Sequence, residues 1–185
     1  MSVLVLNSGS SSVKFALFEA GTLARLGGGT VERIGTDSTV FSWWTGASEA
    51  ASGSGETRLP MADHQRCLEH LFDALPEIAP GAKPAAIGHR VVHGGDRFAG
   101  AVPVDREVLD AIEQCRPLAP VHNPLNRLGI EVAGRRYPDT PQIAVFDTAF
   151  HQTMPARARR YALPERIVTA RGIRRYGFHG ISHQF

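Results

Sequence analysis

The chain has 185 residues, of which 43% are hydrophobic, which is enough for one ordinary domain with a sizeable core and the start of a second. This composition argues against disorder of the whole chain. The 20 Lys and Arg residues nearly balance the 18 Asp and Glu residues, which argues against a protein built chiefly to bind nucleic acid.

The sequence pattern of the first third of the chain predicts β-strands. An apolar run over residues 3–6 and a β-branched and aromatic run over residues 13–18 flank a Gly/Ser loop, so we expect a hairpin-like pair. Further strands are expected over residues 24–34, 40–44 and 57–61, with an exposed loop over residues 46–55. The starting run is too short for a signal peptide or a membrane span, so we expect a soluble cytoplasmic protein.

Helices and strands alternate farther along the chain. Asp63 is expected to cap a helix that runs to about Leu75, and Asp105 to cap a shorter one. Asn123 is expected to cap a third helix, with Pro124 in the favoured first position. Strands first and alternating elements afterwards predict a mixed α/β sheet with helices packed on it.

Two strands are expected among these helices, over residues 85–92 and 142–146, and the second ends at Asp147. From residue 151 onward the chain is basic and interrupted by Pro and Gly. Cys67 and Cys115 have neither metal-ligand spacing nor a CxxC partner, so we expect two reduced, apolar side chains.

The segment Asn7-Ser-Gly-Ser-Ser-Ser-Val-Lys14 joins the first two strands. Gly9 allows the backbone to approach an anion closely, and the hydroxyl and free N–H groups can bind phosphate oxygens near Lys14. It is not a GxxxxGK[ST] loop, because the second Gly is missing and a strand follows it. A polar hairpin turn with an exposed Lys is the alternative interpretation.

The segment Gly88-His-Arg-Val-Val-His-Gly-Gly95 contains a cation beside an apolar side chain. Arg90 and Val92 project to the same face of a strand, an arrangement suited to a small carboxylate with a short hydrocarbon tail. His89 and His93 lack the Glu of an HExxH motif and would diverge on a strand, so zinc is not expected. A surface Arg at a strand end is the alternative.

Three further residues are candidates for anion or metal chemistry. His122 precedes a helix start, where an anion is favoured, and Asp147 closes an apolar strand, where it can hold Mg²⁺ or accept a proton. His179 lies between glycines that would allow it and Phe178 to enter a cleft. Taken singly, each also fits a structural role, as a lone His, a capping Asp or a basic surface loop.

Together these segments resemble the acetate kinase family, which includes acetate, propionate and butyrate kinases. The resemblance runs from Val3 to Phe185 and rests on five segments in register. They are Asn7–Lys14, Gly88–Gly95, Leu118-Ala-Pro-Val-His-Asn-Pro124, Phe146-Asp-Thr-Ala-Phe-His-Gln-Thr-Met-Pro155 and Arg175-Tyr-Gly-Phe-His-Gly180.

The resemblance implies an actin-like, ribonuclease H-like fold and reversible phosphoryl transfer from Mg²⁺-ATP (or Mn²⁺-ATP) to acetate, giving acetyl phosphate and ADP. It implies catalytic roles for Asp147, His122 and His179. It implies acid binding by Arg90, with Val92, Val121 and Phe178 around the methyl group. It also implies phosphate binding by Lys14, Gly9, Ser10, Ser11 and Ser12, and metal organisation by Asn7.

The resemblance also implies that the chain is the amino-terminal part of an enzyme about twice as long, typically a homodimer. We expect one actin-like domain over residues 1–149 and the start of a second over residues 150–185. The remaining half would carry the adenosine-binding loops, a second Arg and a metal-binding Glu, so we expect negligible kinase activity from this chain alone.

Several alternatives remain open at this point. Val121 stands where the family usually has Leu, and one methylene of space leaves acetate and propionate unresolved. A propionate or butyrate kinase and a non-catalytic actin-like nucleotide-binding module are the main alternatives. A nuclease of ribonuclease H type would need clustered carboxylates, and Asp147 is the one well-placed strand-end carboxylate. We expect neither nucleic acid nor a membrane as a partner.

Overall fold

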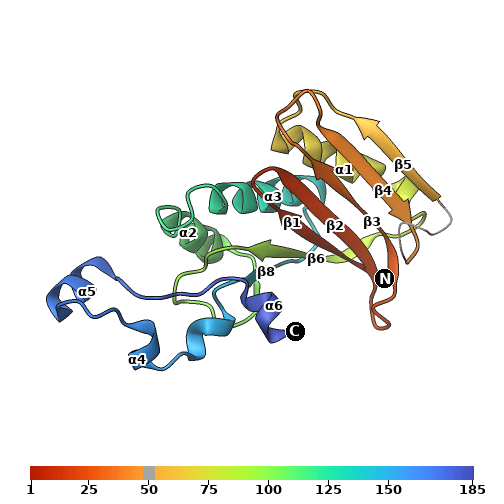
Figure 1. Cartoon of the computed structure of the whole chain (residues 1–185). Helices are drawn as coiled ribbons and strands as arrows, with labels where there is room; N and C mark the ends of the chain where they lie inside the picture. Colours follow the sequence, from red (N-terminus) through yellow and green to blue (C-terminus); the bar gives the residue numbers. More distant parts are fainter. Residues whose placement is uncertain (48–52) are drawn as a thin grey trace.

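The computed structural model describes residues 1–47 and 53–185 as one mixed sheet with helices packed on it (Figure 1). The strands are β1 (Ser2–Ser8), β2 (Ser12–Glu19), β3 (Arg25–Glu32), β4 (Val40–Thr45), β5 (Gly53–Arg58), β6 (Pro84–Val91), β7 (Val102–Pro103) and β8 (Gln142–Phe146). The helices are α1 (His64–Ile78), α2 (Arg106–Gln114), α3 (Asn123–Arg136), η1 (Phe150–Thr153), α4 (Ala156–Arg159), α5 (Glu165–Arg171) and α6 (Gly180–Gln184).

The strand order β5-β4-β3-β2-β1-β6-β8-β7 places the parallel strands at one side of the sheet. β1 pairs with β2 in an antiparallel hairpin and with β6 in parallel, and β6 pairs in parallel with β8. The carboxyl ends of β1, β6 and β8 therefore lie at the same edge. Ligands bind at that edge in open α/β sheets.

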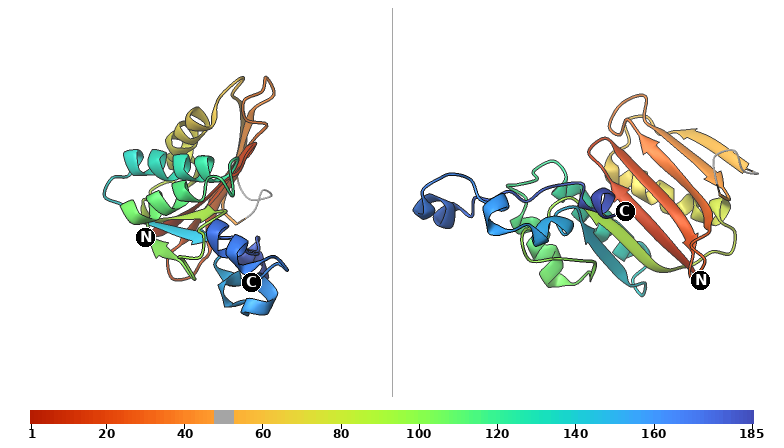
Figure 2. Two further views of the ribbon diagram at one scale, coloured as in Figure 1. Left: turned by 90° about the vertical axis from the view of Figure 1, so that its left-hand side faces the viewer. Right: turned by 60° about the horizontal axis from the view of Figure 1, so that its bottom comes forward.

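The core lies between the sheet and the helices α1 and α3, which cover the same face of it (Figure 2). In α1 the buried residues Leu68, Leu71, Phe72 and Leu75 follow the i, i+3, i+4, i+7 spacing of one helix face. They pack against inward residues of β1 and β2, such as Leu17. Full burial of one such side chain contributes about 1.5–3 kcal/mol, so this layer anchors the sheet.

A second apolar cluster lies beneath β6 and β8. It joins Val91 and Phe146 from the strand ends to Ile112 of α2 and Ile130 of α3. Val91 and Phe146 are also register partners. The polar segments that follow both strands therefore leave the sheet from a packed base.

The hairpin, the mixed sheet and the helix caps expected at Asp63 and Asp105 are confirmed. Asp63 accepts a hydrogen bond from the backbone N–H of Arg66 at 2.8 Å, and Asp105 accepts one from Val108 at 2.9 Å. Cys67 is buried and free, and burial raises the pKa of its thiol to about 11, which keeps it protonated. Cys115 is likewise buried and free.

The expected role of Asn123 is wrong. The residue at the N-cap position of α3 is His122, and Asn123 is the first helical residue. The Asn123 amide is buried and donates to the carbonyl oxygens of His93 and Ile112. Its side chain therefore joins the end of β6 to α2 and α3, which a local capping rule does not reveal.

The boundaries of the fifth strand are also wrong. β5 runs from Gly53 to Arg58, whereas the expectation covered residues 57–61. Pairing with β4 extends the strand into Gly and Ser residues of low strand propensity. Residues 48–52 of the expected loop lie outside the described part of the chain.

Three consecutive glycines do not interrupt β3, because the neighbouring side chains need their space. A Cβ atom on Gly29 would lie 2.6 Å from the Phe15 ring. Phe15 is buried and stacks on Phe41. The close approach of the two strands thus explains a glycine run that by composition alone weakens a strand.

Residues 150–185 have almost no buried side chains. α4 and α5 project away from the sheet, whereas α6 lies beside η1 and β8 (Figure 1). The division into residues 1–149 and 150–185 stays a prediction. In the described ranges, no helix combines the length and apolar character that crossing a membrane requires.

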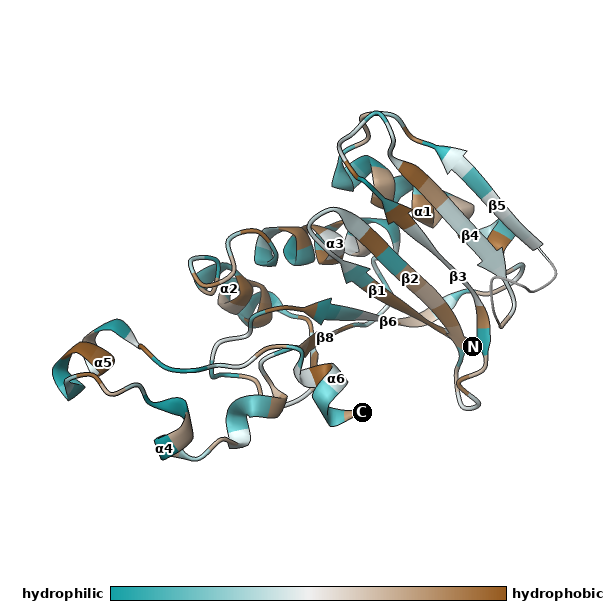
Figure 3. Ribbon diagram, in the orientation of Figure 1, coloured by the Kyte–Doolittle hydropathy of each residue, from teal (hydrophilic) through white to brown (hydrophobic). Residues whose placement is uncertain are grey.

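Hydropathy differs between the centre and the edge of the sheet. β2 is predominantly hydrophobic, whereas β5 is pale or hydrophilic along its length (Figure 3). Strand β2 alternates buried and more exposed residues, while β5 at the sheet edge buries none completely. The edge strand therefore contributes pairing and little core.

Candidate functional site

A cleft of about 580 Å³ lies where β1, β6 and β8 end. All five segments singled out in the sequence contribute to it. The lining includes Asn7, Gly9, Ser10, Ser12, Lys14, Arg90, Val92, Val121, His122, Asp147, Phe178 and His179. Of the expected site residues, Ser11 alone does not line this cleft.

The Gly/Ser loop forms one wall. The Gly9 N–H donates to the Ser12 carbonyl at 2.8 Å, and the Gly9 carbonyl is 3.0 Å from Nε2 of His64 in α1. Ser11 is exposed, and its carbonyl accepts a hydrogen bond from the Ile34 N–H. The loop is thus closed on itself and held by α1, with the Ser11 side chain outside the cleft.

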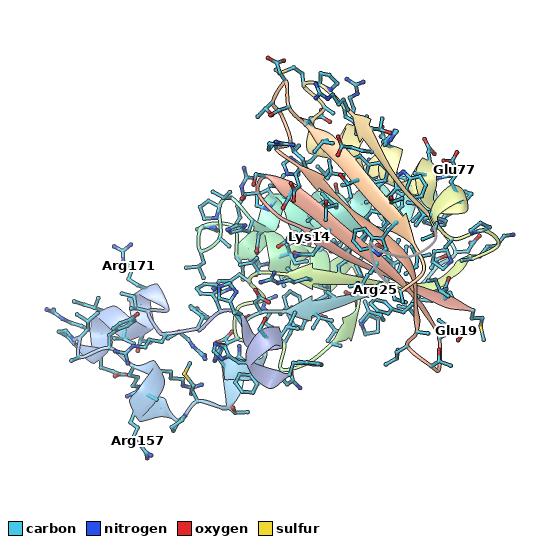
Figure 4. The ribbon with its side chains drawn as sticks, turned by 45° about the vertical axis from the view of Figure 1, so that its right-hand side comes forward. Lys14, Glu19, Arg25, Glu77, Arg157 and Arg171 are labelled. Carbon is cyan, nitrogen blue, oxygen red and sulfur yellow. The ribbon has the colours of Figure 1, made fainter. Side chains whose placement is uncertain are left out.

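Lys14 lies directly opposite Asn7 in the β1–β2 register, so their side chains share one face of the sheet. Lys14 is exposed and stands out from β2 (Figure 4). A mobile ammonium group and an amide therefore flank the Gly/Ser loop. This combination suits phosphate oxygens and a metal ion that accompanies them.

Arg90 and Asp147 form an ion pair at the base of the cleft. Arg90 Nη2 donates to Asp147 Oδ2 at 2.6 Å, and Nε donates to Oδ1 at 3.0 Å. Asp147 is 1% exposed, and its N–H donates to the Val91 carbonyl, which extends the β6–β8 pairing by one residue. The hydrogen bond to Asp147 raises the pKa of Arg90 and outweighs the opposing effect of burial.

The sequence predicts that Arg90 binds a substrate carboxylate, a role in which its two parallel hydrogen bonds would go to that carboxylate. In the structure these bonds go to Asp147, and the pair does not use Nη1 of Arg90. Asp147 therefore fixes the orientation of the guanidinium. One edge of the guanidinium is left for another group.

His179 completes the cluster from the other wall. Its Nδ1 accepts a hydrogen bond from Arg90 Nη2 at 3.3 Å and lies 4.0 Å from Asp147 Oδ2. The backbone of His179 is left-handed, with φ of 55°, which costs a non-glycine residue about 1–2 kcal/mol. Gly180 holds this turn by donating its N–H to the Asp147 carbonyl at 2.9 Å.

Val121 and His122 lie at the rim of the cleft, just before α3. Both are exposed, and in the described part of the chain His122 makes no side-chain capping bond to α3. The first backbone N–H groups of a helix carry partial positive charge. A protonatable ring at this position is therefore available to an anion in the cleft.

Sequence reasoning missed Asn126. Its Oδ1 accepts from the Val92 N–H at 2.9 Å, and its Nδ2 donates to the Ser8 carbonyl at 2.8 Å. One buried amide thus ties the Gly/Ser loop to the end of β6. The available signal was a polar residue at i, i+4, i+7 spacing with Ile130 and Ala133 on the buried helix face.

The histidines of the β6 segment have separate partners. His89 is buried against Oε1 of Gln142 at 2.7 Å, while Nδ1 of His93 accepts from the Gly95 N–H at 3.0 Å. Among the described residues, no group of three or more His, Cys, Asp or Glu side chains could hold a metal ion. Neither histidine lines the cleft.

Comparison with known proteins places these features in a family. The acetokinase family model matches residues 2–185. The chain is 48% identical over 185 residues to an acetate kinase of Pseudarthrobacter chlorophenolicus, covering 100% of this chain and 45% of that protein. It is 48% identical over 184 residues to an acetate kinase of Pseudomonas aeruginosa, covering 99% and 45%.

Solved structures agree with the sequence comparisons. A propionate kinase from Francisella tularensis is similar with a TM-score of 0.90 and 41% identity, covering 100% of this chain and 46% of that one. An acetate kinase of Porphyromonas gingivalis is similar with a TM-score of 0.88 and 38% identity, with the same coverage. The chain spans about half the length of the curated relatives it matches. It belongs to the acetokinase family and has the actin-like ATPase fold of that family.

Proposed function

We propose that the protein carrying this chain is a kinase that transfers a phosphoryl group reversibly between ATP and acetate. The observation that carries this proposal is the shared cleft. A phosphate-binding type of loop lies on one wall, an oriented arginine lies at the base, and His122 and His179 line the same cleft. The similar acetate kinases support the same reaction.

In this proposal Lys14 and the Gly9–Ser12 loop bind the nucleotide phosphates, with Ser10 and Ser12 facing the cleft. Arg90, held by Asp147, binds the acid through the guanidinium edge that the ion pair leaves open. Val92, Val121 and Phe178 line the same cleft and would surround the methyl group.

The chemistry requires positioning more than proton removal. A carboxylic acid is ionised at neutral pH, so its oxygen attacks the γ-phosphorus without a general base. A bond forms between that oxygen and phosphorus as the bond from phosphorus to the ADP oxygen breaks. Charge on the transferring group is stabilised from the sides, a role suited to His122 and His179. Asp147 then orients Arg90.

The oxygen donors present fit Mg²⁺ (or Mn²⁺) bound together with a nucleotide. The Asn7 amide, the Ser10 and Ser12 hydroxyls and the Asp147 carboxylate line one cleft. Mg²⁺ is held by one or two carboxylates, waters and substrate phosphates, so a dedicated protein cage is not needed. When bound, the ion supplies charge neutralisation between the phosphates.

The test is turnover of acids with two, three and four carbons by the full-length protein, with ATP and Mg²⁺. We expect acetate to be preferred, and Arg90→Ala to raise KM for the acid at least about tenfold while KM for ATP changes little. A propionate preference would favour the alternative suggested by Val121 and by the similar propionate kinase. Nucleotide binding without turnover of any acid would contradict the proposal and favour a binding module.

We further propose that the 185-residue chain alone turns over negligibly. Phosphoryl transfer requires charge stabilisation on several sides of the γ-phosphate, and the family resemblance implies that a second Arg and a metal-binding Glu lie outside these 185 residues. Acetyl phosphate formation by the isolated chain at the rate of the full-length protein would contradict this expectation.

A further inference from the structure

His93 lies just beyond β6, outside the cleft but directly beneath one of its walls. It is 1% exposed. Its ring meets the Tyr176 ring edge-on at a centroid distance of 4.5 Å and the Phe178 ring at 5.7 Å. Phe178 lines the cleft and immediately precedes His179. The imidazole therefore contacts the wall of the site without contacting the ligand space.

The position of the His93 ring is fixed from both sides. Asn123 accepts from the His93 N–H at 3.2 Å and donates to its carbonyl at 3.0 Å, which clamps the backbone. Nδ1 accepts from the Gly95 N–H, so the neutral ring carries its proton on Nε2. Burial lowers the pKa of His93, and protonation of Nδ1 would set two N–H groups against each other.

On the other side of this contact, Tyr176 and Phe178 are also held by Arg174 and His151. Arg174 lies over the Tyr176 ring at 5.0 Å, and its Nη1 is 3.5 Å from Asp96 Oδ2. His151 Nε2 donates to the Phe178 carbonyl at 2.9 Å. The Phe178 side chain is 43% exposed. The covered part of its ring packs against the imidazole of His93.

We propose that His93 is a positioning residue, a neutral aromatic platform that holds Phe178, and with it the turn at His179, against the cleft. The inference rests on the proposed kinase function. Losing one edge-to-face contact changes an equilibrium constant by a factor of about two to ten. Loss of the contacts to both Tyr176 and Phe178 should therefore weaken acid binding about tenfold.

The experiment compares His93→Ala, His93→Phe and a matched control, His89→Ala, in the full-length protein. His89 is an equally buried imidazole in the same segment, but its partner is Gln142 and it does not contact Phe178. We expect His93→Ala to raise KM for the acid about tenfold and to lower kcat, with KM for ATP unchanged. His93→Phe restores a ring and should recover KM for the acid to within about threefold.

His89→Ala should lose stability like His93→Ala but keep the wild-type KM for the acid. Equal kinetic constants for the two alanine variants, or no recovery in His93→Phe, would overturn the inference. If His93→Ala does not fold, Tyr176→Leu removes the facing ring from the other side. An unchanged KM for the acid in Tyr176→Leu then overturns it. A wild-type protein that phosphorylates no short acid would instead refute the proposed function.

Discussion

The two parts of the chain contribute to the cleft by different means. Residues 1–149 position Arg90 and Asp147 on strands that rest on two apolar clusters. Residues 150–185 position Phe178 and His179 with hardly any buried side chain, and Arg157 and Arg171 of this segment point to solvent (Figure 4). One wall is thus set by a core, and the other by a few local contacts.

The difference predicts how substitutions in each wall affect stability and catalysis. A residue in the core is supported by many neighbours, so its loss lowers the stability of the whole body. The turn at His179 is held by the Asp147 carbonyl, by the Arg90 side chain and by the contact of Phe178 with the His93 ring. Removing one of these contacts should change catalysis before it changes folding. The predictions below test that contrast, starting with the largest expected effect.

Asp147→Asn should show the strongest effect on activity. The amide keeps the shape of the carboxylate but loses the charge that orients Arg90 and lies near His179. We expect kcat of the full-length protein to fall by roughly a thousandfold, the size of effect seen when a preorganised charge is lost. Asp139→Asn, an exposed carboxylate after α3, is the control. Activity of Asp147→Asn within threefold of wild type would contradict the assignment.

Leu71→Ala should strongly destabilise the part of the chain formed by residues 1–149. Leu71 is fully buried in α1, and deletion of such a side chain costs about 2–5 kcal/mol of unfolding free energy. Leu163→Ala in the projecting segment, where the side chain is 46% exposed, should change it by less than about 0.5 kcal/mol. Urea denaturation measures both. Similar losses in the two variants would remove the contrast between the parts.

His89 should make the stability of the folded chain sensitive to acid. Burial lowers the pKa of His89 from 6.5 to about 4, so the unfolded chain binds more protons between these values. Above pH 6.5 the ring is neutral in both states, so His89 does not lower the free energy of unfolding. As the pH falls from 6.5 toward 4, that free energy decreases by about 3 kcal/mol in total. Unfolding free energy measured against pH in wild type and His89→Gln tests this. An equally steep decline in the variant would rule out His89 as its source.

His64→Ala should have the smallest effect. His64 supports the Gly/Ser loop through the Gly9 carbonyl, a single hydrogen bond worth about 0.5–1.5 kcal/mol. We expect an increase of a few-fold in KM for ATP, with KM for the acid unchanged. Isothermal titration with nucleotide checks it against His70→Ala, a second partly buried histidine of α1 that packs on Phe41. Identical ATP affinity in His64→Ala and wild type would mean that α1 does not support the loop.

Much of the fold could be predicted from local patterns. The helix caps at Asp63 and Asp105, the apolar run of β1 and the β-branched and aromatic run of β2 are signals within a few residues of one another. The start of β5 could not be predicted, because its Gly and Ser residues are strand only through pairing with β4. The side-chain role of Asn123 depends on α2 and β6, which are distant in sequence.

The sequence predicted which residues belong to the site but not which side chains contact one another. Segment patterns singled out Arg90, Asp147 and His179 separately. Their contacts span 57 and 89 residues, so no local spacing could indicate that Asp147 occupies the parallel hydrogen bonds of Arg90. Ser11 looked equivalent to Ser10 and Ser12, and only the loop conformation turns it away.

The bridge made by Asn126 has a consequence for substrate length. Because one side chain bonds both Ser8 and Val92, the strand ends carrying the phosphate loop and the arginine cannot separate without breaking it. In the proposed reaction, an acid would therefore meet the γ-phosphate across a constant span. Room for extra methylene groups would then come from the smaller side chain at Val121 or from displacement of Phe178, which lies on the weakly supported wall.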